Sequence, residues 1–157
     1  MGTDKDEAYK VVCVNKKARQ LYEVSETYEA GMVLLGTEIK SIRDGRVILK
    51  DAYAQFKDSE LYLVKCHITP YAQAFYGNHK PERDRKLLLH KREIKKLIGR
   101  VTERGFTIIP LKIYFKWGRA KIEIGLAKGK KIYDHRKEIQ ERDMKRDVER
   151  TFKQRYR

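Results

Sequence analysis

The sequence predicts a mainly β protein in which about six short antiparallel strands close into a small barrel flanked by short helices. Three observations support this fold class. The chain of 157 residues is long enough for one hydrophobic core and too short for two. Several short segments alternate apolar and polar side chains, which is the period of a half-buried strand. Many short strands in one small domain fit a sandwich or a barrel, and closing the sheet removes exposed edges that aggregate.

The first half of the chain is mostly strand. Short apolar runs typical of strands cover Val11 to Val14 and Leu61 to Cys66. Two longer stretches, Tyr28 to Leu35 and Val47 to Lys57, give a similar signal. We expect a strand in each of these four segments.

Two short helices are expected between the strands. Ile94, Leu97 and Ile98 recur at helical spacing among charged residues. Gly99 stands where a C-terminal cap would end that helix. The segment from Thr37 to Arg43 is the second candidate, although it is too short for periodicity alone to identify it.

A β-hairpin is predicted in the second half of the chain. Leu111, Ile113 and Phe115 alternate with Lys and Tyr side chains. After a turn signal at Gly118, the alternation resumes over residues 122–126. We expect these two strands to pair and to bury one face.

The chain changes character near Gly129. From Lys128 to Arg157 it carries 12 Lys and Arg against 6 Asp and Glu, with few large apolar groups. Such a segment buries too little to offset its ordering entropy, yet charges of opposite sign four residues apart favour a helix. We therefore expect a flexible N-terminus over residues 1–9, a barrel over 10–129, and a basic tail over 130–157 that is disordered when free and helical against a partner.

Charge narrows the class of partner. The formal net charge is +15, from 37 Lys and Arg against 22 Asp and Glu. This excess predicts a phosphate-rich partner but does not by itself separate RNA from DNA or anionic lipid. No apolar run reaches the roughly 18 residues of a membrane span, and the N-terminus is charged, so a cytoplasmic protein is expected. Cys13 and Cys66 are isolated and predict neither a disulfide nor a zinc site, and no cofactor is indicated.

Two basic segments are candidates for binding phosphate. The denser one, Lys80 to Lys86, is expected to be a loop, in which arginine forks and backbone N–H groups would meet phosphate oxygens. The alternative is a solvated charged loop ahead of a helix. The second, Leu126 to Lys131, sets a glycine among lysines. It lacks the spacing of a nucleotide-binding P-loop, and a plain strand-ending turn is the alternative.

Several tyrosines stand among cations and could stack on unpaired bases. Most tyrosines of small β domains are instead core or rim residues, so both interpretations stay open. The candidates are Tyr71, Tyr76, Tyr114, Tyr133 and Tyr156.

Signs of catalysis are thin. The four histidines lack the spacing of zinc hydrolases, and no serine lies in a nucleophile-elbow context. Glu29 could serve a nuclease as a base, but an acidic residue with no identified partner is more often structural.

Five stretches stand out in order along the chain: Asn15 to Arg19, Tyr28 to Gly31, Leu35 to Ser41, Lys86 to His90 and Ala127 to Lys131. Together they resemble the SsrA-binding protein (small protein B) family. The resemblance covers nearly everything from Val11 to about Arg150.

The resemblance implies a fold and a function. The fold would be an oligonucleotide-binding-like β-barrel that binds the tRNA-like domain of transfer-messenger RNA (tmRNA, or SsrA RNA) and stands in for the missing anticodon arm. The protein would deliver that RNA to stalled ribosomes for trans-translation. Its tail would enter the decoding centre and mRNA channel and fold into a helix. Elongation factor Tu would be a further partner within the aminoacylated tmRNA complex, and no enzymatic activity is expected.

The resemblance also implies site residues. The family's RNA-contacting positions fall on Asn15, Glu29, Leu88 and Gly129, with the basic neighbours Lys16, Arg19, Lys130 and Lys131. Together with the basic clusters, the predicted RNA-binding set also includes Lys40, Arg43, Arg83, Arg85, Lys86 and His90. The predicted ribosome-binding residues of the tail are Tyr133, Asp134, His135, Arg136 and Lys137. His135 stands where the family usually has Lys, so this position would carry only partial charge near neutral pH.

Two alternatives remain beside this adaptor. One is another barrel-type RNA binder of the ribosome or of translation factors, which would share the charge and the sheet. The other is an RNase or nucleotidyl-transfer enzyme that uses Glu29 and His90.

Overall fold

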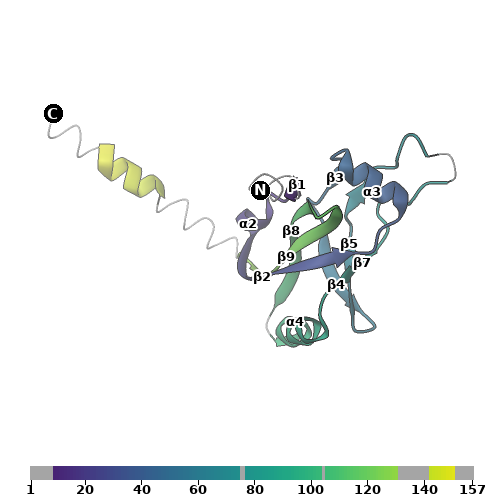
Figure 1. Ribbon diagram of the computed structural model, residues 1–157. Helices are drawn as coiled ribbons and strands as arrows, with labels where there is room; N and C mark the ends of the chain where they lie inside the picture. Colours follow the sequence, from purple (N-terminus) through teal and green to yellow (C-terminus); the bar gives the residue numbers. More distant parts are fainter. Residues whose placement is uncertain (1–8, 75–76, 104, 131–141, 151–157) are drawn as a thin grey trace, which may run out of the picture.

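The computed structural model describes residues 9–74, 77–103, 105–130 and 142–150. Strands dominate it, and short helices lie at separate margins of the sheet (Figure 1), so the expected mainly β class is confirmed. The elements are β1 (Tyr9–Val14), α2 (Ala18–Leu21), β2 (Tyr22–Met32), α3 (Gly36–Arg43), β3 (Val47–Ile48), β4 (Tyr53–Lys57), β5 (Glu60–Val64), β6 (His67–Ile68), β7 (Arg85–Leu88), α4 (Lys91–Glu103), β8 (Phe106–Lys116), β9 (Arg119–Gly129) and a helix over residues 142–150.

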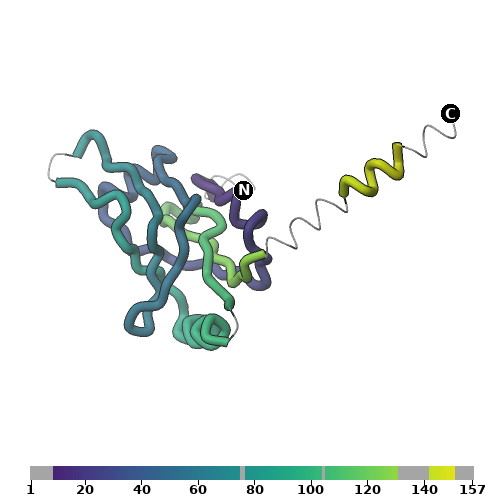
Figure 2. The backbone as a smooth tube through the Cα atoms, turned by 180° about the vertical axis from the view of Figure 1, so that it is seen from behind, coloured from purple at the N-terminus to yellow at the C-terminus, as the bar shows by residue number. Residues whose placement is uncertain are grey.

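The main sheet closes on itself. Its seven antiparallel strands follow the order β1-β8-β4-β5-β7-β2-β9, and a further pairing joins β8 to β9. Six strands therefore form a ring, and β1 is attached to β8 beside it. Figure 2 shows the strands curving round a common interior. Two strands share one edge of β8, because β1 pairs along residues 112–116 while β4 meets it at Ile108.

The ring is joined unevenly. Strands β2, β9 and β8 pair along most of their length. By contrast, β4 meets β8 through a single register pair, Ala54 with Ile108. Strand β7 pairs with β2 at Gly31 and Met32, and one more backbone hydrogen bond runs from Val33 to Lys86 at 3.0 Å. The unit formed by β4, β5 and β7 is thus attached to the remaining strands by narrow junctions at both ends.

The main core is built by all six strands of the ring. Each contributes fully or nearly fully buried side chains, and α3 and α4 add Ile42 and Leu97, both 0% exposed. Burial of such aliphatic side chains supplies about 1.5–3 kcal/mol each and is the dominant stabilising contribution. Typical members are Ala30, Ala54, Leu61, Leu87, Ile113 and Ile124.

A second, smaller core lies on the other face of the hairpin. Ala18 of α2 packs there against Ile109, Leu111 and Ala127. A bulge between Pro110 and Lys112 reverses the alternation, so Leu111 joins this cluster while Ile113 joins the main core. The prediction of a hairpin with one buried face is therefore wrong, because α2 covers the second face.

Several predicted boundaries also differ. The strand expected from Tyr28 to Leu35 runs from Tyr22 to Met32, and the segment from Val47 to Lys57 divides into β3 and β4. The helix expected to end at Gly99 continues to Glu103, since a glycine inside a helix costs only about 1 kcal/mol and neighbouring Leu97 is anchored in the core.

Part of the predicted basic loop is strand. β7 begins at Arg85 and alternates inward and outward side chains, with Arg85 and Leu87 buried and Leu88 exposed. The loop prediction is wrong from that residue on. Elsewhere, Cys13 and Cys66 are free thiols. Within the described residues, no helix is long and apolar enough to cross a membrane, and no group of potential ligands could hold a metal ion.

Candidate nucleic-acid interface

One surface pocket, called here the Glu29 pocket, gathers residues from distant parts of the chain. Strand β2 lies between β7 and β9, and Gly31 is opposite both Leu88 and Lys121. This pairing brings three of the predicted RNA-binding residues together with four others. The lining residues are Glu29, Gly31, Leu88, Leu89, His90, Glu93 and Lys121.

The absence of a side chain at Gly31 keeps the pocket open. A Cβ at this position would lie 3.4 Å from the Cβ of Leu88 and 3.7 Å from the Nζ of Lys121. Both are ordinary contact distances, so any larger side chain would occupy the space between Leu88 and Lys121. Gly31 therefore forms the floor between an apolar wall and a cationic one.

Glu29 provides an ionised acceptor in this cationic surface. The hydroxyl of Tyr114 donates to its Oε2 at 2.5 Å, and the Nζ of Lys116 lies 3.5 Å from the same oxygen. The hydrogen bond from Tyr114 lowers the pKa of Glu29, burial opposes it, and Lys116 and Lys121 lower it further. The carboxylate stays charged at neutral pH and can accept hydrogen bonds from a base or a ribose hydroxyl.

Tyr114 acts as a support for Glu29. The sequence indicates this tyrosine as a candidate for stacking, but the residue is only 3% exposed. Burial, followed by the hydrogen bond to Glu29, raises the pKa of its hydroxyl, which therefore remains a donor. A buried ring of this kind cannot stack on a base at the surface.

Leu88 and His90 form the opposite wall. Leu88 is 50% exposed, which is unusual for a leucine in a strand whose neighbour Leu87 is 1% exposed. Its side chain offers an apolar surface to a ribose or a base. The backbone N–H of His90 donates to the Oε1 of Glu93 at 3.3 Å, which fixes the start of α4 at the rim.

Helix α4 is held against β2 by more than its apolar face. The hydroxyl of Tyr28 donates to Glu26 at 2.6 Å, and Lys96 and Arg100 lie 3.6 and 3.7 Å from the same carboxylate. Burial and the bond to Glu26 raise the pKa of Tyr28 to about 12. These contacts, with the buried Leu97, fix the position of the rim residues on α4.

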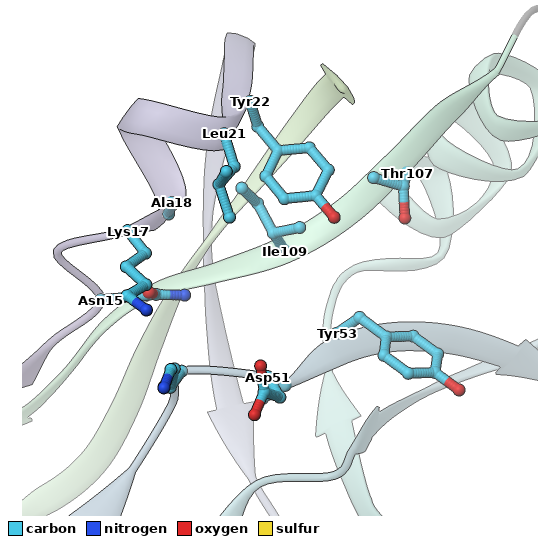
Figure 3. A pocket seen from close by; sticks show the side chains of 11 residues that line it. Asn15, Lys17, Ala18, Leu21, Tyr22, Asp51, Tyr53, Thr107 and Ile109 are labelled. Atoms are coloured by element: carbon cyan, nitrogen blue, oxygen red, sulfur yellow. The ribbon is translucent and has the colours of Figure 1, made fainter. Parts of the chain in front are cut away.

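A second pocket, called here the Asn15 pocket, lies beside α2. Figure 3 shows Tyr22 and Tyr53 on different sides of it, with Asp51 on the same side as Tyr53. Asn15 fixes the loop between β1 and α2, because its Nδ2 donates to the carbonyl oxygens of Pro110 at 3.0 Å and Leu49 at 3.4 Å. The pocket thus combines two aromatic rings with polar groups.

The end of β9 reaches the same corner. Gly129 pairs with Tyr22, and the N–H of Lys130 donates to the carbonyl of Leu21 at 2.8 Å. Asn15 and Gly129 therefore flank the same short helix, although they are 114 positions apart in the sequence. The basic neighbours Lys16 and Arg19 are exposed there as well.

Three predicted residues lie in other surroundings. Lys40 stands over the ring of Tyr71 and Arg43 over the ring of Phe115, with 5.4 and 5.7 Å from the cation to the ring centre. The Nζ of Lys86 lies 2.8 Å from Glu60. None of these three side chains lines the Glu29 or Asn15 pocket.

Arg85 is not at the surface. Its side chain is 0% exposed and bonds the Oε2 of Glu38 at 2.5 Å and the carbonyl of Cys66 at 2.6 Å. Arg83 bonds the other oxygen of Glu38 at 2.5 Å and is about one-third exposed. In this structure Arg85 cannot reach an RNA backbone, so its predicted role is corrected to a structural one; a buried guanidinium requires a paired carboxylate, and Glu38 supplies it.

The remaining predicted residues lie outside the described part of the chain. They are Lys131, Tyr133, Asp134, His135, Arg136 and Lys137. Sequence reasoning missed Lys121 because only the strand register places it opposite Gly31. It also missed Tyr22 and Tyr53, whose position beside Asn15 follows from the three-dimensional fold.

Comparisons with known proteins show to which family the chain is similar. A family model described as "SmpB protein" matches residues 12–154. The chain is 52% identical over 152 residues to the SsrA-binding protein of Trichormus variabilis, covering 96% of this chain and 98% of that protein. It is 56% identical over 146 residues to the SsrA-binding protein of Geobacillus thermodenitrificans, covering 93% and 94%.

A solved structure gives the same result in three dimensions. It is described as "tmRNA-SmpB: a journey to the center of the bacterial ribosome". It superimposes with a TM-score of 0.64 at 51% identity, over 76% of this chain and 85% of that one. Because the family model spans nearly the whole chain and relatives exceed half identity over almost all of it, this chain belongs to the SmpB family.

Proposed function

We propose that this protein binds the tRNA-like domain of transfer-messenger RNA and delivers it to stalled ribosomes for trans-translation. Membership of the SmpB family, whose relatives are named SsrA-binding proteins, supports this function. The observation that carries it in the structure is the Glu29 pocket, which joins Glu29, Leu88 and His90 from separate segments.

The pocket offers three kinds of contact to one RNA. Lys121 supplies charge for a phosphate, Leu88 supplies apolar surface for a base or ribose, and Glu29 accepts from exocyclic or ribose donors. A carboxylate among cations repels phosphates but accepts hydrogen bonds, so it favours a particular orientation of the bound RNA. This combination suits recognition of a folded RNA better than uniform attraction of any polyanion.

The corner at α2 provides a second anchor. Asn15, Arg19, Gly129 and Lys130 surround it, and the Asn15 pocket places Tyr22 and Tyr53 nearby. We infer that the ring of six strands works as an oligonucleotide-binding-like barrel whose two anchors contact different parts of the tRNA-like domain. Strands β2 and β9, which pair along most of their length, would hold the two anchors at a fixed spacing, as mimicry of an anticodon arm requires.

The remaining parts of the proposal concern the ribosome. The basic segment after Gly129, with Tyr133, His135 and Arg136, would enter the decoding centre and mRNA channel and become helical there. Elongation factor Tu would join the complex through the aminoacylated RNA. The protein would act in the cytoplasm as an adaptor without catalytic chemistry.

The geometry argues against Glu29 as a general base. Its pKa is lowered, which makes the carboxylate a weaker base, and its Oε2 already accepts from Tyr114. An adaptor predicts that purified protein shifts the mobility of the RNA without shortening it, with or without divalent metal. Shortening of the RNA would support the enzyme alternative instead.

A mobility-shift titration tests the proposed function directly. The protein is titrated against the tRNA-like domain and against an ordinary tRNA at about 0.15 M salt, where nonspecific attraction is partly screened. We expect a preference of about tenfold or more for the tRNA-like domain, equivalent to about 1.4 kcal/mol. Equal weak binding to both would reduce the protein to a general RNA binder.

A further inference from the structure

Trp117 has an unusual position for the chain's single tryptophan. It lies at the tip of the β8–β9 hairpin and is 68% exposed. Tryptophan normally buries most of its large apolar surface, and its exposure is unfavourable in water. The main and second cores do not include it.

The backbone at this tip is also unfavourable for the residue. Lys116 pairs with Arg119, so Trp117 and Gly118 form a two-residue turn, and both have positive φ, 54° and 73°. This pattern is that of a type I′ turn, whose first central position favours Asn, Asp or Gly. A bulky side chain in the left-handed region is strained. Both the exposure of Trp117 and its backbone conformation lower the stability of the fold, so stability does not explain why a tryptophan stands here.

The turn borders the Glu29 pocket. Lys116, directly before Trp117, lies 3.5 Å from the Oε2 of Glu29. Lys121, four positions after Trp117, lines the same pocket. Arg119 is exposed beside the turn. An exposed indole is thus fixed by a paired hairpin among three cations, close to the carboxylate proposed to recognise RNA.

We propose that Trp117 is a stacking platform for an unpaired base of the RNA that occupies the Glu29 pocket. An indole face stacks on any base, and neighbouring Lys and Arg side chains meet the adjoining phosphates. The flanking charge favours RNA over an apolar protein surface, and the short, paired turn limits the entropy lost on binding. The inference rests on the proposed function for the identity of the RNA, and it adds a contact outside the pocket.

The single tryptophan allows a direct test by intrinsic fluorescence. The full-length protein is titrated with the tRNA-like domain, and binding is followed in parallel by mobility shift. Stacking should quench the emission of Trp117 in step with the shifted fraction, whereas inorganic polyphosphate, which has charge but no bases, should leave it unquenched. RNA binding with unchanged emission, or equal quenching by polyphosphate, would overturn this inference alone. Absence of any RNA binding would overturn the proposed function as well.

Substitution separates a binding role from a structural one. Trp117→Asn should weaken binding of the tRNA-like domain about 5- to 150-fold, the range expected for one base stack. The same change relieves the left-handed strain, so it should raise the midpoint of thermal unfolding by about 2–4 °C. A variant that binds RNA less well and is more stable excludes misfolding as the cause.

Two further variants complete the test. Trp117→Phe keeps an aromatic face and should retain most of the affinity. Ile48→Asn removes another exposed apolar side chain, 55% exposed, from a strand outside the ring, and it should leave the affinity unchanged. Wild-type affinity in Trp117→Asn, or an equal loss in Trp117→Phe, would contradict the stacking role.

Discussion

At the scale of single residues, Glu38 is a charged group that is fully buried and fixed by three hydrogen bonds. It is 0% exposed and accepts hydrogen bonds from Arg85, Arg83 and the backbone N–H of Leu35 at 2.5, 2.5 and 2.8 Å. These contacts tie α3 to β7, the strand that carries Leu88. A buried carboxylate in this position stabilises the arrangement only while its cationic partners remain.

Glu38→Gln should destabilise the fold strongly. The substitution leaves the buried guanidinium of Arg85 without a counter-charge, and breaking a buried pair in this way costs about 3–5 kcal/mol. Urea unfolding measures the change. Glu60→Gln is a matched control, because Glu60 pairs with Lys86 at the surface and should leave the free energy of unfolding nearly unchanged. Similar stability of the two variants would contradict the role assigned to Glu38.

The pH dependence of stability should report the same group. Burial raises the pKa of Glu38, but the bonds from Arg83, Leu35 and Arg85 outweigh it, so the pKa lies below its ordinary value of 4.5. The stabilisation is therefore fully present above about pH 4.5 and is lost as the pH falls through the folded-state pKa. The difference in unfolding free energy between wild type and Glu38→Gln should shrink over that acidic range. A difference that stays constant there would show that protonation of Glu38 is not responsible.

At the residue level, the sequence named RNA-binding candidates mainly through motifs shared with the SsrA-binding protein family. Glu29 and Leu88 were assigned in this way, and their RNA contacts stay a prediction; the structure places both side chains in one pocket. Arg85 was misassigned because composition shows a basic cluster but not which side chains of a strand point inward. Its partner Glu38 is 47 positions away, so no local pattern reveals the pair.

At the scale of elements, two of the three glycines in the paired strands β2 and β9, Gly31 and Gly125, have different roles. A Cβ at Gly125 would lie 3.0 Å from Val24 and 3.2 Å from Leu111, inside the second core. A Cβ at Gly31 would meet Leu88 and Lys121 at ordinary contact distances in the Glu29 pocket. Gly125 permits close packing of Val24 and Leu111 from the neighbouring strands, and Gly31 keeps a surface pocket open.

Gly31→Ala and Gly125→Ala should therefore separate binding from stability. Gly31→Ala should weaken RNA binding by mobility shift with little change in thermal unfolding, because it narrows the pocket without a clash. Gly125→Ala should cost about 1–3 kcal/mol by overpacking the second core. A Gly31→Ala protein that binds RNA like wild type would argue that no RNA group enters between Leu88 and Lys121.

The sequence predicted whether a segment is a strand or a helix better than it predicted where the element begins and ends. The β8–β9 hairpin was evident from alternation, but the bulge that places Leu111 and Ile113 in different cores was not. The second core also includes Ala18 of α2, and α2 has only four residues, too few for a periodic signal. Short pairs such as β3 with β6 likewise depend on contacts distant in sequence.

At the scale of the whole molecule, truncation can separate RNA binding by the ring from the proposed action of the tail on the ribosome. Residues 142–150 are helical and all exposed, so they add no buried surface to the ring. A protein that ends before Tyr133 should keep its unfolding midpoint and its preference for the tRNA-like domain over ordinary tRNA. It should lose the ability to rescue stalled ribosomes in a translation assay. Loss of the RNA preference in this variant would contradict the proposed division between ring and tail.

The narrow junctions of the ring have a consequence for motion. Strands β4, β5 and β7 join the remaining strands through Ala54 at one end and through Gly31 and Met32 at the other. Such a segment is expected to open as a cooperative unit before the rest unfolds, and its amide protons should exchange with solvent sooner. The Glu29 pocket bridges one of these junctions, because Leu88 lies on β7 and Glu29 on β2. A bound RNA that contacts both strands would stabilise the closed junction between β2 and β7. Hydrogen exchange should then slow throughout β4, β5 and β7, including amides far from any RNA contact.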